Sequence, residues 1–201
     1  TDLHVGGFSG YISGSSISNV ILNGIKNLNA TYITSKNPGN QVRTIQMGGF
    51  AGYISSGSAT SFENIYLYFD ANMAMTNDIQ WSKGGQIDKE VGKFYGSLSG
   101  SVTLNNINLY YNANPSSSLA NPIKDADSSN STYYNQIINP TGNDIASNKI
   151  NLYTYTDSTQ GKETFKQALE SQNNSGGAFE SNNIQYTQDS SGNYYYYFTN
   201  T

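Results

Sequence analysis

Short runs of alternating apolar and polar residues recur through residues 1–114. Alternation with a period of two, enriched in aromatic and β-branched side chains, is typical of β-strands. The clearest runs are Ile17, Val20 and Leu22; Phe62, Ile65, Leu67 and Phe69; and Val102, Leu104, Ile107 and Leu109. Clusters of Gly, Ser and Asn separate them, and these residue types favour turns because Gly and Asn tolerate positive φ. This pattern predicts an all-β region.

One phrase occurs three times in this region. GGFSGYI at residues 6–12 returns as GGFAGYI at 48–54 and, altered, as GKFYGSL at 92–98. The copies begin 42 and 44 residues apart, and self-similarity at such a period is typical of stacked repeats. Hairpins in a β-sandwich would also give short strands, but they do not require the same phrase at corresponding positions. We therefore predict a parallel β-helix, or β-solenoid, with repeats that start near residues 6, 48 and 92.

Stacked repeats would bring equivalent side chains of successive copies together. We expect Phe8, Phe50 and Phe94 to form an internal aromatic column. The asparagines that open the run after each phrase would form an amide ladder; they are Asn19, Asn64 and Asn106. The period is long for one coil, so each repeat is expected to hold two coils or one coil with an insertion. Such insertions would lie at residues 37–40 and 82–85.

Residues 115–201 differ in character from the repeats. A polar stretch from Pro115 to about Asn135 predicts a long loop, and residues 150–153 echo the 107–110 segment. Residues 162–172 predict a short helix with Thr159 as N-cap, because Phe165, Ala168 and Leu169 share one face. Residues 183–188 and 194–199 flank a turn and predict a terminal hairpin. The section is a divergent solenoid coil with an insertion, a cap on the solenoid, or a separate domain.

Composition narrows the class of protein. The chain of 201 residues has 12% charged residues, 13% aromatic residues, a net charge of −4 and no cysteine. With ten scattered Lys and Arg residues, it lacks the basic cluster that nucleic-acid binding needs. No apolar run approaches the roughly 20 residues of a membrane-spanning helix. A neutral, amide-rich and hydroxyl-rich surface favours a secreted or cell-surface protein, and the chain, which begins almost inside the first repeat, is expected to be part of a longer one.

The repeated phrase, followed each time by an Asn-initiated strand, resembles GLUG-type repeats of large bacterial surface proteins. It is similar to the repeat region of filamentous-haemagglutinin-like, two-partner-secreted exoproteins, over about residues 5–114. The resemblance implies a right-handed parallel β-helix, secretion through an outer-membrane partner, and a role in adhesion or display. The family's motif is structural and carries no catalytic residues. The third copy departs from it at Lys93 and Leu98.

Candidate chemical sites are sparse. His4 is the only histidine and stands beside a structural repeat, which favours a position on the surface or at the end of a coil over a catalytic role. Asp125 to Asn130 alternates oxygen ligands but lacks the Gly and Glu of an EF-hand, which leaves a loose calcium site as an alternative. Glycoside cleavage needs two facing carboxylates, and Glu63 aligns with Ser18 and Asn105 instead. Acidic residues otherwise gather loosely around the second repeat: Asp70, Asp78, Asp88 and Glu90. We expect no catalytic residues, no metal site and no cofactor.

Tyrosines are the candidate recognition groups, because a flat apolar ring with a hydroxyl suits sugars and protein surfaces. Tyr66 and Tyr68 alternate with apolar residues, so they should face outward, and Tyr110 offers a similar surface. Trp81, in a segment expected to protrude, is a contact residue or a loop anchor.

The expected function is therefore non-catalytic adhesion or display on a bacterial surface. Its partner would be a glycan or protein of a host or neighbouring cell. The alternatives are a purely structural stalk of a larger exoprotein or toxin, and a polysaccharide-degrading β-helix enzyme.

Overall fold

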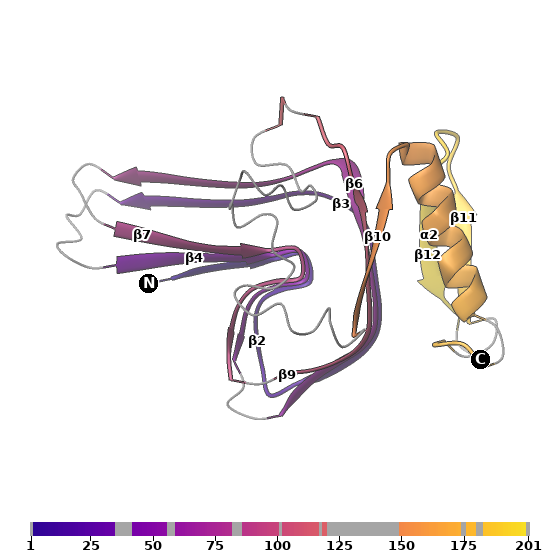
Figure 1. The fold of residues 1–201 in the computed structure, drawn as a ribbon, viewed down its shortest axis with the longest axis horizontal. Helices are drawn as coiled ribbons and strands as arrows, with labels where there is room; N and C mark the ends of the chain where they lie inside the picture. Colours follow the sequence, from indigo (N-terminus) through magenta and orange to yellow (C-terminus); the bar gives the residue numbers. More distant parts are fainter. Residues whose placement is uncertain are drawn as a thin grey trace.

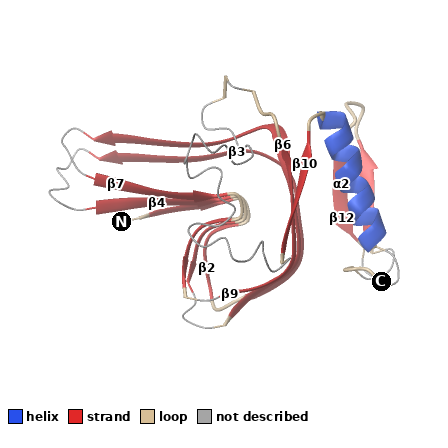
Figure 2. Cartoon of the chain, in the orientation of Figure 1, coloured by secondary structure: helices blue, strands red, loops and turns tan. Residues whose placement is uncertain are grey.

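The computed structural model describes residues 2–34, 42–55, 59–81, 86–100, 102–116, 118–119, 149–173, 176–179 and 183–199, without the side chains of 32–34, 42–43, 76–81 and 86–89. The expected insertions at 37–40 and 82–85, most of the polar loop after Pro115 and the loose calcium site at 125–130 lie outside these residues. The described chain is largely β, with parallel sheets and the helix α2 (Figure 2). The prediction of a β chain built from parallel strands is confirmed.

The three repeats form three parallel sheets, and each repeat contributes one strand to each sheet (Figure 1). The first sheet contains β1 (Leu3–Gly6), β4 (Val42–Gly48) and β7 (Gln86–Gly92). The second contains β2 (Ser9–Ser13), β5 (Ala51–Ser55) and β8 (Tyr95–Ser99). The third contains the long strands β3 (Ser16–Thr34) and β6 (Thr60–Trp81), then β9 (Val102–Asn112) and β10 (Ile150–Tyr155). Each repeat is thus one layer of three strands, stacked on the next.

The predicted phenylalanine column is confirmed and runs through all three layers. The ring centroids of Phe8 and Phe50 are 4.9 Å apart, those of Phe50 and Phe94 are 5.0 Å apart, and both pairs are stacked. Phe50 and Phe94 are fully buried, whereas Phe8 is 46% exposed because it lies in the first layer. Offset aromatic contacts at such distances add to the stability gained from burial. The column therefore ties each layer to the next at one point of the core.

The predicted amide ladder is also confirmed, and it has a backbone cause. Asn19, Asn64 and Asn106 have φ of 57°, 55° and 53°. Asparagine tolerates this left-handed conformation better than other non-glycine residues. The Nδ2 of Asn64 donates to Oδ1 of Asn19 (3.1 Å), and that of Asn106 donates to Oδ1 of Asn64 (3.0 Å). One residue type thus satisfies both the chain bend and the contact between layers.

The third copy has Lys93 where the second copy has Gly49, and the lysine side chain occupies space that is closed in the second layer. A Cβ at Gly49 would lie 2.1 Å from the Lys93 carbonyl oxygen and 2.5 Å from the Phe69 ring, so only glycine fits there. In the third layer the Lys93 side chain is 2% exposed, with its ammonium 4.2 Å from the centroid of the Tyr111 ring. A cation over an aromatic face is attracted by the ring quadrupole. The third layer therefore keeps the same backbone path with a different interior.

The C-terminal section adds one strand to the third sheet and then covers that sheet's outer face. β10 pairs with β9 in the register that the echoed sequence predicts, Ile150 beside Ile107. Helix α2 (Ser158–Gln172) begins earlier than expected, because Asp157 and not Thr159 is its N-cap: the Asp157 carboxylate accepts from the Gln160 amide (2.8 Å). The hairpin of β11 (Ile184–Gln188) and β12 (Tyr194–Phe198) is antiparallel, as predicted.

The phenylalanine column gives a matched test of stacking. We expect Phe50→Ala to lower the free energy of unfolding by about 3–5 kcal/mol, because it leaves a cavity between two buried rings. Phe8→Ala removes the same side chain from the half-exposed end of the column and should cost roughly 1 kcal/mol. Urea unfolding followed by circular dichroism measures both. Equal losses would contradict the burial order of the column.

Substitutions at Asn64 separate the ladder from its backbone conformation. Asn64→Ala should lower the free energy of unfolding by about 2–4 kcal/mol, since it loses the amide bonds and keeps an unfavourable φ. Asn64→Gly loses the same bonds but accepts φ of 55°, so about 1–2 kcal/mol is expected. Thermal and urea unfolding of the two variants gives the difference. A glycine variant as unstable as the alanine variant would show that φ is not the reason for asparagine.

Candidate functional site

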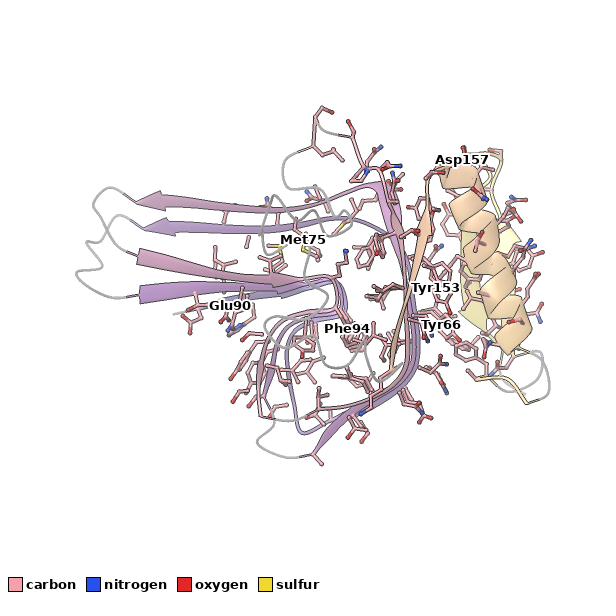
Figure 3. All side chains as sticks on the ribbon, in the orientation of Figure 1. Tyr66, Met75, Glu90, Phe94, Tyr153 and Asp157 are labelled. Atoms are coloured by element: carbon pink, nitrogen blue, oxygen red, sulfur yellow. The ribbon has the colours of Figure 1, made fainter. Side chains whose placement is uncertain are left out.

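The tyrosines expected to be exposed are buried beneath the C-terminal section. Tyr66, Tyr68 and Tyr110 do face away from the interior of the layers, as their alternation with inward residues predicts. Their exposed fractions are nevertheless only 3%, 2% and 4%, so the expectation of solvent-facing rings is wrong. The reason is tertiary: α2 and the chain after it lie over this face of the third sheet (Figure 3).

The buried tyrosines form a second core with residues of α2. Phe165 packs against Tyr68 and Tyr110 with centroid distances of 5.4 and 5.0 Å, and Tyr155 stacks on Tyr68 at 5.3 Å. Burial raises the pKa of the Tyr66, Tyr68 and Tyr110 hydroxyls above the usual value of 10.0, so they remain neutral donors. The Tyr155 hydroxyl donates to the Phe69 carbonyl. These rings attach the C-terminal section to the repeats.

The remaining candidates are dispersed. Trp81 is the last residue of β6, and its side chain is not among those that the structure describes. His4 packs against the rings of Tyr53 and Tyr11, at centroid distances of 5.3 and 5.9 Å. Glu63 pairs with Ser18 and Asn105 in the neighbouring strands, as the aligned sequence predicts. In the described ranges, no cluster of three or more His, Asp or Glu side chains could hold a metal ion.

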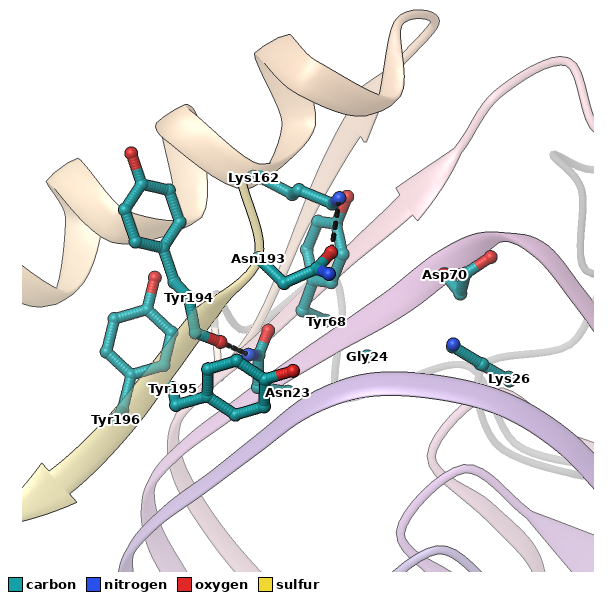
Figure 4. Close-up of a pocket in the computed structure, with 10 residues that line it drawn as sticks. All are labelled: Asn23, Gly24, Lys26, Tyr68, Asp70, Lys162, Asn193, Tyr194, Tyr195 and Tyr196. Atoms are coloured by element: carbon teal, nitrogen blue, oxygen red, sulfur yellow. Dashed lines mark hydrogen bonds between the residues drawn. The ribbon is translucent and has the colours of Figure 1, made fainter. Parts of the chain in front are cut away.

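A polar cleft of about 180 Å³ lies where the hairpin meets the first two layers (Figure 4). Its walls are Asn23, Gly24, Lys26, Tyr68, Asp70, Lys162, Asn193, Tyr194, Tyr195 and Tyr196. Segments far apart in sequence thus converge on it: the bends of β3 and β6, the start of α2, and the first residues of β12.

A bulge in the third sheet creates one wall of the cleft. The register between β3 and β6 shifts on both sides of Ile25, and Gly24 has a φ of 76°. Ile25 pairs with Phe69 but Asn27 pairs with Ala74, so Lys26 alone stands opposite the four residues 70–73. Bulges bend strands and redirect side chains. Here the bend brings Lys26 and Asp70 to the cleft.

Hydrogen bonds hold the opposite wall in place. The Lys162 ammonium donates to Oδ1 of Asn193 (2.7 Å), while the Asn193 backbone amide and Nδ2 both donate to the Asp189 carboxylate (2.9 Å each). Asn23 Nδ2 donates to the Tyr194 carbonyl (2.7 Å) and so joins the hairpin to the first layer. Hydrogen bonds within the chain therefore fix the positions of Lys162, Asn193 and Asn23 in the cleft wall.

A second groove, of about 440 Å³, runs between α2 and the strands β9 and β10. Tyr66 and Tyr110 contribute to it beside the amides of Asn108 and Asn151, which bond to each other at 3.1 Å. Tyr153, at its rim, is 41% exposed and stacks on Tyr110 at 4.5 Å. Among the predicted tyrosines, Tyr66 and Tyr110 thus meet in this groove, whereas Tyr68 reaches the polar cleft.

Sequence reasoning missed the residues that shape the polar cleft. Asn23 and Lys26 lie in a segment of β3 where the alternation of apolar and polar residues is interrupted. This interruption is the one signal in the sequence that points to the bulge. The sequence predicts a turn that includes Asn193, and the structure confirms it. The contact of Asn193 with Lys162 spans 31 residues, however, and depends on how the hairpin packs.

The carboxylate that positions Asn193 gives a test by pH. Hydrogen bonds from the Asn193 side chain and backbone lower the pKa of Asp189 from 3.8 to about 2. A carboxyl whose pKa is lowered by folding stabilises the fold above its unfolded pKa, and this contribution is lost as pH falls toward 2. We expect the NMR shift of the Asn193 amide to titrate with a midpoint near 2, and Asp189→Asn to abolish this titration. A midpoint near 3.8 would contradict the geometry.

Comparison with protein families, with curated proteins and with solved structures finds no match to this chain. The resemblance of the repeated phrase to GLUG-type repeats accordingly stays a prediction. In the parts of the chain that the structure describes, no helix has the length and apolar character needed to cross a membrane. The function has to be inferred from the geometry of the repeats and of the cleft.

Proposed function

We propose that this chain is a non-catalytic recognition module of a secreted or surface-exposed bacterial adhesin or exoprotein. Its scaffold would be a right-handed parallel β-helix. The in-register sheets support this, since equivalent residues such as Gly6, Gly48 and Gly92 lie side by side. A stack of this kind gives a stiff support for whatever it carries.

The observation that carries the proposal is the polar cleft between the repeats and the hairpin. Its groups are held before any ligand arrives: Lys162 by Asn193, and Asn193 by Asp189. Preorganised polar groups bind with less loss of conformational freedom. Tyr195, which is 56% exposed, adds a flat apolar ring at the cleft. A few convergent polar groups beside aromatic rings are typical of a ligand site.

The partner in this proposal is a glycan or protein on a host or neighbouring cell, and the parent protein would leave the cell through an outer-membrane secretion partner. A chain with only 12% charged residues and many amides and hydroxyls suits contacts made largely by hydrogen bonds. Individual contacts of this kind are weak, and repeated copies of an exposed module would add avidity.

A second function, a spacer within a larger exoprotein, is favoured by the phenylalanine column and the amide ladder. Both connect equivalent positions of all three layers and do nothing that requires a ligand. A spacer would be rigid and would bind no surface.

Binding of the whole chain to cell surfaces and to a glycan array tests the proposal. We expect binding that falls about tenfold in Tyr195→Ser, because the exposed ring at the cleft is lost. Tyr11→Ser is the matched control: Tyr11 is 52% exposed, but it lies on β2, away from the cleft walls. Retained binding is expected in this control.

The contradictory outcomes are distinct. If the wild-type chain binds no surface, while Phe50→Ala and Asn64→Ala destabilise it as predicted, the recognition proposal fails and the spacer function remains. Equal loss in Tyr195→Ser and Tyr11→Ser would show that recognition does not lie at the cleft.

A further inference from the structure

We propose that the polar cleft binds an acidic monosaccharide, that is, one pyranose ring that carries a carboxylate, at an exposed position of a surface glycan. The inference rests on the proposed recognition function and adds the chemical class of the ligand. It depends on the size of the cleft, on its charges, and on the hydrogen-bonding groups that remain available.

The size of the cleft sets the size of the ligand. Sites for drug-sized molecules occupy roughly 300–1,000 Å³. A cleft of about 180 Å³ is smaller, so it accommodates a single ring rather than an oligosaccharide chain. Tyr195, beside the cleft, presents a half-exposed face of the kind on which the apolar face of a pyranose packs.

The charges favour an anionic group on this ring. The chain has a net charge of −4, yet two of its ten cationic side chains, Lys26 and Lys162, line the cleft with the single carboxylate of Asp70. Lys26 forms no ion pair within 4.0 Å with any described residue; the ion pairs found there belong to Lys166. The close-up shows the Lys26 ammonium directed toward the middle of the cleft, with Asp70 beside it (Figure 4). A ligand carboxylate there would gain a charge-assisted hydrogen bond.

Further donors and acceptors match the hydroxyls of a sugar. A lysine ammonium has three donors, and Asn193 uses one from Lys162, so the others can point into the cleft. Asn23 donates through Nδ2 to the Tyr194 carbonyl and keeps Oδ1 as an acceptor. The Asp70 carboxylate accepts from the Asn72 amide (3.0 Å) and has further lone pairs for a hydroxyl. Donors and acceptors therefore alternate around the cleft, as ring hydroxyls require.

Two other ligand classes fit less well. A phosphate site commonly combines its cation with backbone N–H groups, as at a helix N-terminus or in a P-loop, or uses an arginine fork. The cleft offers neither: its cations are two lysines, and Lys162 is the fifth residue of α2. A neutral sugar would satisfy Asn23 and Asp70 but would leave the Lys26 ammonium without an anionic partner.

Titration of the intact chain with three probes tests the inference: methyl glucuronide, methyl glucoside and inorganic phosphate, by NMR shift or calorimetry. We expect the glucuronide to bind at least about tenfold more tightly than the other two, since a hydrogen bond to a charged group is worth more than a neutral one. Lys26→Gln should weaken glucuronide binding about tenfold. Lys149→Gln, an exposed lysine outside the cleft walls, should leave it unchanged.

Equal affinity for glucuronide and glucoside, tighter binding of phosphate, or no binding of the glucuronide would overturn the inference. The same holds if Lys26→Gln and Lys149→Gln behave alike. Assaying Lys26→Gln for binding to cell surfaces separates this result from the broader proposal. Surface binding that persists in wild type and in Lys26→Gln, with no affinity for the glucuronide, overturns the ligand and leaves the recognition function. A wild-type chain that binds the glucuronide through Lys26 but adheres to no surface overturns adhesion and leaves the site.

Discussion

Parallel pairing between equivalent residues of successive layers is the constraint on which the rest of the structure depends. Backbone amides of one layer donate to carbonyls of the next, as from Phe8 to Phe50 (2.9 Å) and from Phe50 to Phe94 (2.8 Å). Because side chains alternate between faces, a shift of one residue would turn every inward side chain outward. The aromatic column, the amide ladder and the close approach at Gly49 all follow from this register. These three contacts between layers explain why the same sequence phrase recurs at the equivalent position of each layer.

The outer face of the third sheet gives this stack a second core. Tyr66 and Tyr68 occupy alternate positions of β6, and Tyr110 lies beside Tyr68 on β9. Phe165 of α2 covers Tyr68 and Tyr110, and Phe179, which follows the helix, packs on Tyr66. The position of the hairpin therefore depends on the register of the layers beneath it, since the same strands supply both faces. The polar cleft lies at the edge of this second core, where the hairpin reaches the first layer through Asn23 and the Tyr194 carbonyl. The proposed recognition site therefore lies at the interface between the repeats and the C-terminal section.

The repeats could be predicted from sequence because their evidence is local and recurs. Phe50 and Asn64 each have counterparts at matching places in the other copies, so stacking follows from alignment alone. Alternation likewise predicts which way Tyr66 and Tyr68 point, but it does not say what covers them, and their burial was missed. The cleft was beyond prediction for a related reason: Asn23 and Tyr194 are 171 residues apart and meet only through packing. The bulge at Gly24 also broke the pattern on which the strand prediction relied.

The register between the first two layers changes its offset along the chain, and this has a practical consequence. Ile12 pairs with Ile54, 42 residues on; Val20 pairs with Ile65, 45 residues on; and Leu28 pairs with Met75, 47 residues on. Between the second and third layers, Gly48 pairs with Gly92, which is an offset of 44 residues. The offset thus changes between β5 and β6 and at the bulge, while the straight segments stay aligned. A foreign peptide inserted between β5 and β6 should therefore leave the stack intact, which makes this connection a suitable site for grafting an epitope or a label. The corner at Gly49, where only glycine fits, is not such a site.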